Sequence, residues 1–239
     1  MERRDALAAE PGDAAPTMIL ADLLASRFSC RAFLPDPVPT ATIERMLTLA
    51  QLSPSWCNSQ PWQAIVTEGA GTERFRAALL AHVHATGEPG QPDLPYPVGY
   101  FGVYQERRRE CGWQLYRSVG VTPGDRVGSA QQAMENFRLF GAPHVMIVTS
   151  ERDLGVYGAV DCGLYVGNLL LAAESLGVAT IAQAALARCS PFLHEHFAIP
   201  PSRTVVCGIS FGYADTRHKA NGFRTRRADL AEAVHWVRA

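Results

Sequence analysis

The chain of 239 residues lacks an excess of charge of either sign. Its 22 Lys and Arg residues are balanced by 23 Asp and Glu residues, and the formal net charge is −1. A protein that binds nucleic acids through their phosphate backbone usually carries a clear basic excess. We therefore expect no general nucleic-acid-binding function.

The cysteines and histidines form no recognisable motif. The six cysteines include no C-x-x-C pair, and no group of Cys and His has the spacing of a zinc site. His194 and His196 lie two positions apart, so they cannot share one face of a helix. We therefore expect no bound metal, and we expect reduced core thiols in a cytoplasmic protein. Cys57 has no neighbouring His or Lys to activate it, so we expect a small packing residue.

Long apolar segments are also missing. The longest, around Leu164 to Leu176, is interrupted by Asn168 and Glu174, which indicates a buried helix and not a membrane span. Residues 1–16 alternate charged residues with Ala, Pro and Gly, and they contain no continuous apolar core. We interpret them as a loose leader and not as a signal peptide. Residues 17–239 then form a single domain.

Familiar catalytic motifs are absent as well. We find no convincing Ser-His-Asp set, pair of carboxylates or nucleophilic cysteine motif. No G-x-G-x-x-G occurs either, so a nicotinamide nucleotide would not be bound as in a Rossmann domain. If the protein is an enzyme, a cofactor is expected to supply the chemistry.

The apolar pattern that is present predicts an α-rich chain with a few strands. Helices are expected over 17–26, 40–53, 72–83, 130–140, 158–176 and 191–197, and strands over 63–67, 144–149, 178–182 and 204–211. The longest helix lies between two of the strands, which favours an α+β sandwich with one mixed sheet. Gly163 and Gly167 on this helix would permit close approach of another helix, in the core or at a subunit contact.

Residues 86–128 form a long irregular segment rich in proline and glycine. Such segments are usually functional lids, binding loops or disordered regions, and here the aromatic content argues against disorder. We predict a lid-like insert that is helical from about Tyr104 to Val119. Arg107 and Arg108 would bind a substrate carboxylate or lie on a solvated helix face. The aromatic residues available to stack on a planar substrate are Tyr96, Tyr100, Phe101 and Tyr104.

Two short polar segments indicate the ligand. The first, 27–33, holds Arg27, Ser29 and Arg31, whose guanidinium and hydroxyl groups suit the oxygens of a phosphate. The second, 54–62, presents a hydroxyl and two carboxamides between prolines, which suits a planar heterocycle with donors and acceptors along its edge. Together they predict a site for a phosphorylated flavin, and therefore redox chemistry. The basic tail 221–227 would be solvated, fold back to the same phosphate, or cross to a partner subunit.

These segments resemble the FMN-dependent nitroreductase family. The resemblance runs from about Leu20 to Trp236, and the insert is similar to the branch that acts on nitrobenzoate and other nitroaromatics. The motifs that carry it are Arg-x-Ser-x-Arg at 27–31, Pro-Ser-x-x-Asn-x-Gln-Pro-Trp at 54–62, Gly-Ala-Pro at 141–143, the helix 161–177 followed by Val-Ala-Thr, and Asn221-x-x-Arg224-x-x-Arg227.

The resemblance implies a homodimeric α-β-α sandwich with two FMN molecules at the subunit interface. Phe28 would act through its backbone, and the choice among Arg224, Arg226 and Arg227 for the phosphate is left open. The residues implied for FMN are Arg27, Phe28, Ser29, Arg31, Arg224 and Arg227 on the phosphate side, Pro54, Ser55, Trp56, Asn58 and Gln60 from the other subunit, and Gln183 and Ala184 near flavin N5.

The implied activity is NAD(P)H-dependent reduction of nitroaromatic or quinone-like substrates by a ping-pong mechanism. Two alternatives are compatible with the same residues, because a fold does not fix a function. One is another flavin enzyme, such as a reductive dehalogenase or an oxidase of a biosynthetic intermediate. The other is a non-catalytic protein that binds FMN.

Overall fold

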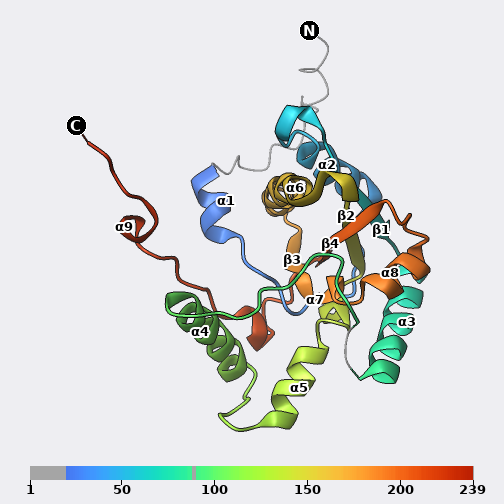
Figure 1. Cartoon of the computed structure of the whole chain (residues 1–239). Helices are drawn as coiled ribbons and strands as arrows, with labels where there is room; N and C mark the ends of the chain where they lie inside the picture. The colour runs from blue at the N-terminus through green and yellow to red at the C-terminus, as the bar shows by residue number, and fades with distance from the viewer. Residues whose placement is uncertain (1–19, 88–89, 239) are drawn as a thin grey trace, which may run out of the picture.

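The centre of the molecule is a four-stranded sheet. A computed structural model describes residues 20–87 and 90–238, so the expected leader 1–16 lies outside the described residues. The sheet has the order β1-β2-β4-β3, and every neighbouring pair is antiparallel (Figure 1). Its strands are β1 (Gln63–Thr67), β2 (His144–Glu151), β3 (Ala179–Gln183) and β4 (Arg203–Gly212). The four predicted strands are therefore confirmed to within two residues.

The expectation of a mixed sheet needs one correction. Helix α6 (Gly155–Ser175) connects β2 to β3, and these two strands run in the same direction because both are antiparallel to β4. Since β4 lies between them, they form no parallel ladder. Within the described residues, parallel pairing is limited to one isolated bridge between Ser29 and Thr180.

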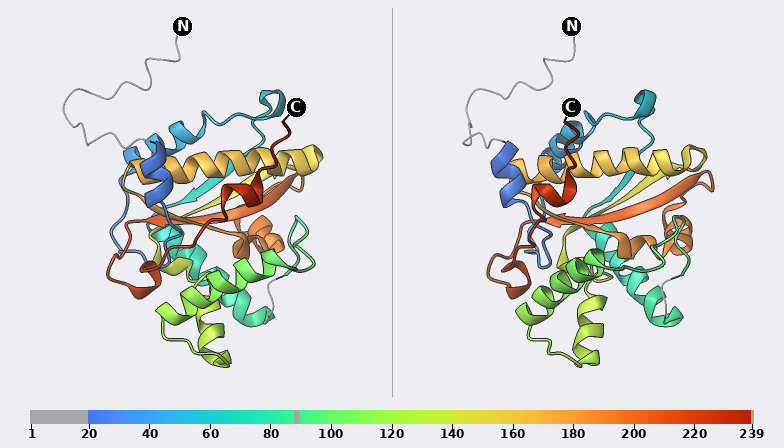
Figure 2. Two further views of the ribbon diagram at one scale, coloured as in Figure 1. Left: turned by 90° about the vertical axis from the view of Figure 1, so that its left-hand side faces the viewer. Right: turned by 60° about the vertical axis from the view of Figure 1, so that its left-hand side comes forward.

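Helices cover both faces of the sheet, which confirms the α-β-α sandwich (Figure 2). Side chains alternate between the two faces of a strand. In β2, Met146 and Val148 face the layer of α2 (Thr40–Ala50) and α6. Val145 and Ile147 face the layer of α3 (Ala70–Thr86), α7 (Ala184–Ala187) and α8 (Ser190–Phe197). Strand β2 is apolar in sequence because both of its faces are buried.

Helix α6 buries only one of its two apolar faces. The segment Arg152–Ser175 is long and apolar enough to cross a membrane by length and composition alone, but α6 packs on α2, β2 and β3. The buried face includes Asp161, Cys162, Tyr165 and Leu169. The other face exposes Val156, Tyr157, Val160 and Leu164. The apolar composition therefore fits a helix that packs on the core with one face and exposes a second apolar face to solvent.

The insert is partly helical over its described residues. Helix α4 (Val103–Ser118) confirms the helix predicted over 104–119. Helix α5 (Arg126–Met134) begins earlier than predicted, because the carboxylate of Asp125 caps it by accepting the Gly128 N–H. It also ends earlier, because the chain enters the left-handed region at Leu139 and Phe140 (φ 57° and 52°).

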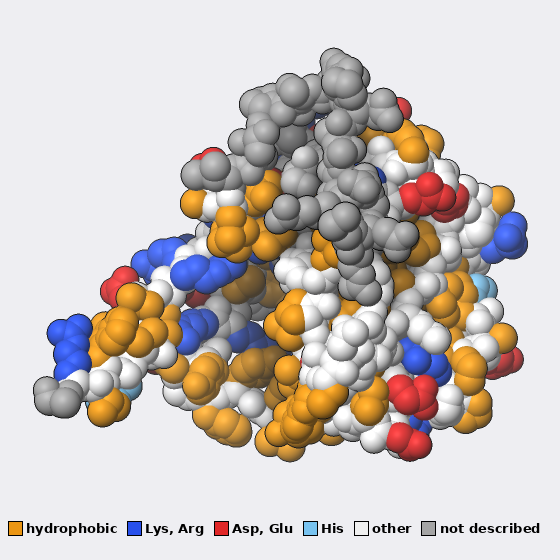
Figure 3. All heavy atoms as spheres, turned by 90° about the horizontal axis from the view of Figure 1, so that it is seen from above, with side chains coloured by type: hydrophobic (Ala, Val, Ile, Leu, Met, Phe, Trp, Pro, Cys, Tyr) orange, Lys and Arg blue, Asp and Glu red, His pale blue; other side chains and the backbone are white. Residues whose placement is uncertain are grey.

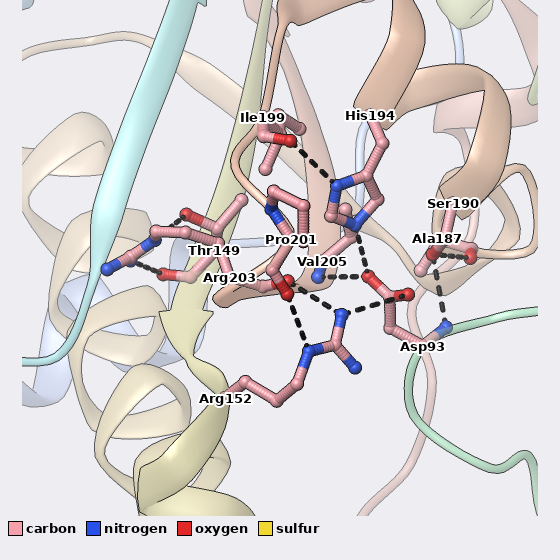
Figure 4. Close-up of polar contacts among 10 residues, drawn as sticks. All are labelled: Asp93, Thr149, Arg152, Ala187, Ser190, His194, Ile199, Pro201, Arg203 and Val205. Atoms are coloured by element: carbon pink, nitrogen blue, oxygen red, sulfur yellow. Dashed lines mark hydrogen bonds and ion pairs between the residues drawn. The ribbon is translucent and has the colours of Figure 1, made fainter.

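Asp93 fastens the start of the insert to the body of the protein (Figure 4). Its carboxylate lies 2.8 Å from Nε2 of His194 and accepts the Val205 N–H at 2.8 Å. Arg152 lies 3.7 Å from the same carboxylate and also donates to the carbonyls of Pro201 and Arg203. The insert is thereby linked to α8 and β4 at once.

We expect Asp93→Ala to loosen this segment. Hydrogen bonds to a charged group contribute about 1.5–3 kcal/mol each, so the free energy of unfolding should fall by about 2 kcal/mol, and amide exchange in residues 90–102 should accelerate. Asp153→Ala is the matched control, because Asp153 is exposed and has no hydrogen bond or ion pair within the described chain. Unchanged exchange in Asp93→Ala would contradict the anchoring role.

Candidate functional site

Two distant segments enclose a cavity of about 330 Å³. One follows α1 (Leu20–Ser26), and the other follows the short turn Lys219–Asn221 near the C-terminus. We call this cavity the arginine pocket. Its lining residues are Leu24, Ala25, Arg27, Phe28, Ser29, Arg31, Cys111, Phe223, Arg224, Thr225 and Arg227. Every residue predicted for the phosphate side therefore lines one cavity.

Asn221 joins the two segments. Its side chain is buried; Oδ1 accepts the Arg31 N–H at 2.7 Å, and Nδ2 donates to the carbonyls of Ala32 (2.8 Å) and Asp215 (2.9 Å). The sequence presented Asn221 only as part of a motif and not as a site residue. The Asn-Gly pair at 221–222 indicates a turn, but nothing in the sequence shows that its amide binds a segment 190 residues away.

Aromatic rings orient two of the arginines. The Arg224 Cζ lies 3.9 Å from the centre of the Phe28 ring, and the Arg31 Cζ lies 5.5 Å from the centre of the Phe223 ring. Each segment thus supplies a ring for the arginine of the other, in two cation–π contacts. The side chain of Phe28, for which only a backbone role was expected, positions Arg224.

The arginine pocket carries uncompensated positive charge. Within the described part of the chain, Arg27, Arg31, Arg224 and Arg227 form no ion pair, and the last three donate only to backbone carbonyls and the Thr225 hydroxyl. Burial lowers the pKa of Arg31, although a guanidinium stays charged in proteins. Basic side chains gather in the hollow between the C-terminal arm and the body (Figure 3). An anion with several acceptor oxygens would stabilise this arrangement.

Arg226 is directed elsewhere. Its guanidinium binds Glu110 on α4, with Nη2 at 2.8 Å and Nε at 3.0 Å from Oε1. Of the three tail arginines, only Arg224 and Arg227 line the arginine pocket. In this protomer the tail therefore folds back to the segment 27–31 of its own chain, which was one of the three arrangements considered for it.

Asn221→Ala should weaken both the fold and the pocket. The substitution removes three buried hydrogen bonds, and each contributes about 0.5–1.5 kcal/mol. We expect the free energy of unfolding in urea to fall by about 2 kcal/mol. Thr122→Ala, at an exposed position whose hydroxyl has no described partner, should lower it by less than about 0.5 kcal/mol. Equal stability of the two variants would show that Asn221 does not join the segments.

The second predicted segment is a loop in an unusual backbone conformation. It contains the single turn Trp56–Asn58, and Cys57, Asn58 and Gln60 have φ values of 51°, 55° and 47°. Left-handed conformations at residues other than glycine are strained by about 1–3 kcal/mol each and cluster at functional sites. We call residues 55–60 the strained loop. Neighbouring contacts must hold this conformation.

Most amides of the strained loop are already paired. The Gln60 N–H binds the Ser55 hydroxyl at 2.9 Å, and its side-chain amide donates to Asn58 and accepts from Gln51. The Asn58 Nδ2 donor has no partner among the described residues, and Asn58 is exposed. Asn58 is thus the amide of this loop that is free to donate to a ligand. Pro54 and Trp56 are exposed as well.

At the junction of β3 and α7, the backbone is available to a ligand, whereas the Gln183 side chain is not. Gln183 is buried; its Nε2 donates to the Asn136 carbonyl at 2.9 Å, and its Oε1 accepts from Ser210 at 2.6 Å. Ala184 is exposed, and the Tyr96 hydroxyl donates to its carbonyl. The insert therefore contacts the predicted flavin segment through Tyr96.

The other predicted substrate residues lie on the insert. Tyr100, Phe101 and Tyr104 are exposed, and the Arg108 Cζ lies 5.4 Å from the centre of the Tyr100 ring. Arg107 Nη2 lies 2.9 Å from the Glu232 carboxylate on α9 (Leu230–Ala233). Arg107 is exposed on α4, as expected for a solvated helix face, but its guanidinium is engaged by Glu232.

Most of the thiols are unreactive. Burial raises the pKa of Cys30, Cys162 and Cys189 to about 11 and that of Cys207 to about 12, so these thiols stay protonated at neutral pH. Cys57 is exposed, so the expectation that it is a packing residue is wrong. No group of His, Cys, Asp or Glu suited to a metal ion occurs in the described ranges.

The arginine pocket and the strained loop lie apart in one protomer. Both views of Figure 2 place α1 near the carboxyl end of α6 and the strained loop near its amino end. Asp161, which contacts this loop, is 14 residues from the last residue of α6, or about 20 Å along the axis. The two halves of the predicted site therefore do not meet within a single chain.

Comparisons with known proteins agree with the fold. The model of the nitroreductase family matches residues 24–213. The nitroreductase NfnB of Mycolicibacterium smegmatis is 36% identical over 93% of this chain and 96% of its own length. The 4-nitrobenzoate reductase of Pseudomonas putida is 34% identical over 90% of this chain and 94% of its own.

A solved structure gives the same result. The FMN-dependent nitroreductase NfnB from Mycobacterium smegmatis, in complex with NADPH, superimposes with a TM-score of 0.86 at 35% identity, over 91% of this chain and 97% of the other. The family match covers most of the chain, and the two relatives align over 90% or more of it. The chain belongs to the nitroreductase family.

Proposed function

We propose that the protein is an FMN-dependent oxidoreductase that uses NAD(P)H to reduce nitroaromatic substrates. The observation that carries the proposal is the arginine pocket, where four arginines with no carboxylate partner among the described residues and one serine converge from opposite ends of the chain. Such a donor set fits the phosphate of FMN. The relatives named as 4-nitrobenzoate reductase and FMN-dependent nitroreductase support the same cofactor and substrate class.

The residues present fit FMN in two places. Arg27, Ser29, Arg31, Arg224 and Arg227 would hold the phosphate. The backbone at Gln183 and Ala184 would lie near the flavin ring, because the Gln183 side chain is used inside the protein. Bound FMN would supply the hydride acceptor and donor, which explains why the chain needs no nucleophile of its own.

A second copy of the chain would complete the site. The exposed face of α6 is apolar, and the space beside Gly163 and Gly167 is open to an approaching helix. In a dimer with twofold symmetry, every contact occurs twice with the roles of the protomers exchanged. If two α6 helices pack antiparallel, the strained loop of one protomer reaches the arginine pocket of the other. Pro54, Ser55, Trp56, Asn58 and Gln60 would then contact the partner's flavin.

The insert would cover the opening above the flavin. Tyr96 already contacts the β3–α7 junction, and the exposed rings of Tyr100, Phe101 and Tyr104 can stack on a planar aromatic substrate. Arg108, held near the Tyr100 ring, would bind a carboxylate on such a substrate. The nicotinamide and the nitroaromatic would use this opening in turn, which gives ping-pong kinetics. The six free cysteines support a cytoplasmic location.

The test is an absorption spectrum followed by a titration. The purified protein should be yellow, or should stay yellow when FMN is added and the excess is removed by gel filtration, and anaerobic NADPH or NADH should bleach it. Addition of 4-nitrobenzoate should restore the colour, whereas a halophenol should not. A protein that binds FMN but is not reduced by either nucleotide would contradict the proposed activity. A protein that takes up no FMN would contradict the proposed cofactor.

A further inference from the structure

Asp161 is a buried carboxylate without a described cationic partner. It lies in the second turn of α6 and is 5% exposed. Its two oxygens accept the Trp56 N–H at 3.1 and 3.2 Å, and Oδ2 also accepts the Ser59 hydroxyl at 3.2 Å. A buried charge is strongly unfavourable unless hydrogen bonds compensate it. Here the compensating donors all come from the strained loop.

These donors stand on both sides of the strained turn. Trp56 precedes Cys57 and Asn58, which have φ values of 51° and 55°, and Ser59 follows them. The carboxylate therefore spans the two left-handed residues and fixes the ends between which they are held. Asn58 is exposed; its Oδ1 accepts from Gln60 Nε2, and its Nδ2 donor has no described partner.

A second contact from α6 provides an internal comparison. Asn168 lies seven residues after Asp161, on the same side of the helix, and its Nδ2 donates to the Ser53 hydroxyl at 2.8 Å. Ser53 precedes the strained loop, and its φ is not positive. Asn168 therefore holds the base of the loop, whereas Asp161 holds the turn itself.

We propose that Asp161 is a positioning residue for the flavin of the partner protomer. Its carboxylate keeps the strained loop in the one shape that presents Asn58 to the flavin edge. Because the strained loop and the arginine pocket lie at opposite ends of α6, this effect is exerted on the FMN held by the arginines of the second chain. The inference rests on the proposed FMN site and dimer, and it adds to them a residue that touches neither the cofactor nor a substrate.

The first experiment measures FMN affinity by quenching of flavin fluorescence in the apoprotein. Asp161→Ala should weaken binding about tenfold, because the strained conformation loses its charged acceptor. Asp161→Asn should recover part of this loss, since its oxygen can accept the Trp56 N–H and its amide can donate to Ser59. Asn168→Ala should stay within about twofold of the unmodified protein.

Ser59→Ala provides a second test in case the Asp161→Ala variant does not fold. Ser59 is exposed, so its removal leaves the core intact while it deletes one donor to Asp161. Weaker FMN binding by about threefold is expected, together with a changed visible circular dichroism of the flavin. If the Asp161→Ala and Ser59→Ala variants both bind FMN as tightly as the unmodified protein, the inference is overturned. An equal loss in Asn168→Ala would also overturn it, because any loosening of the loop would then suffice.

The second experiment tests action across the interface. Protomers with Asp161→Ala are mixed with protomers with Arg31→Ala, and differently tagged heterodimers are isolated. If Asp161 serves the partner's flavin, one site joins an intact arginine pocket to an intact loop, and the heterodimer binds one FMN with full affinity. If it serves its own flavin, both sites are damaged and no tight binding is seen. Failure of the unmodified protein to bind FMN would instead refute the proposed function.

Discussion

Replacement of both Arg31 and Arg224 with alanine should abolish measurable FMN binding. Each guanidinium can make charge-assisted hydrogen bonds to a phosphate, and such bonds contribute about 1.5–3 kcal/mol each. Loss of two arginines therefore weakens binding by at least about a hundredfold. Neither arginine has a described carboxylate partner, so their removal leaves no described anion unpaired, although two cation–π contacts are lost. A thermal melt shows whether the variant is folded. Titration of the apoprotein with FMN, followed by fluorescence, gives the dissociation constants.

Arg226→Ala is the matched control for this prediction. Arg226 belongs to the same basic tail, but its guanidinium binds Glu110 and does not line the arginine pocket. Its removal should change FMN affinity less than about threefold, because exposed ion pairs contribute only about 0–1 kcal/mol. If Arg226→Ala weakens binding as much as Arg224→Ala, the assignment of the phosphate to Arg224 is wrong.

Val160→Asp should convert the protein to a monomer that no longer retains FMN. Val160 is 54% exposed on the apolar face of α6, so the isolated protomer can tolerate a carboxylate there. In the proposed dimer the same carboxylate, together with its symmetry mate, would be buried without a partner, at a cost of several kcal/mol. The dimer constant should weaken at least about a hundredfold. Sedimentation and flavin absorbance measure the two effects.

Val127→Asp controls for the introduction of a charge at an exposed valine. Val127 is 69% exposed on α5, away from the face of α6. This variant should remain dimeric and yellow. A Val160→Asp protein that is dimeric, or that is monomeric and still binds FMN tightly, would contradict an interface formed by α6.

The architecture was predicted well from the sequence, because the spacing of apolar residues shows which segments are buried. Strands β1 and β2 begin where expected, since an apolar run between turn residues identifies a buried strand. The helix predicted over 130–140 was displaced to Arg126–Met134, because its limits depend on one capping carboxylate and two left-handed residues. The strand directions were not predictable either. The periodicity does not show that β4 separates β2 from β3.

The ligand-binding residue types of the candidate site were predictable from the sequence, but the residues that hold these segments in place were not. Arginine, serine and amide residues are recognisable as ligand-binding types, and the structure gathers those of the phosphate side in one cavity. Asn221 and Asp161 act through hydrogen bonds to segments far along the chain, which no local pattern encodes. The ion pair of Arg107 could not be predicted from the sequence, because its partner Glu232 lies 125 residues away.

Because the strained loop and the arginine pocket are separated along α6, FMN binding and the association of two chains are coupled equilibria. If neither chain alone offers a complete site, each FMN bound stabilises the association of two chains, and each dissociation event releases cofactor. By mass action, dilution should release FMN even at constant temperature, and excess FMN should oppose this loss. The rise in flavin fluorescence on dilution would then report how much enzyme has come apart.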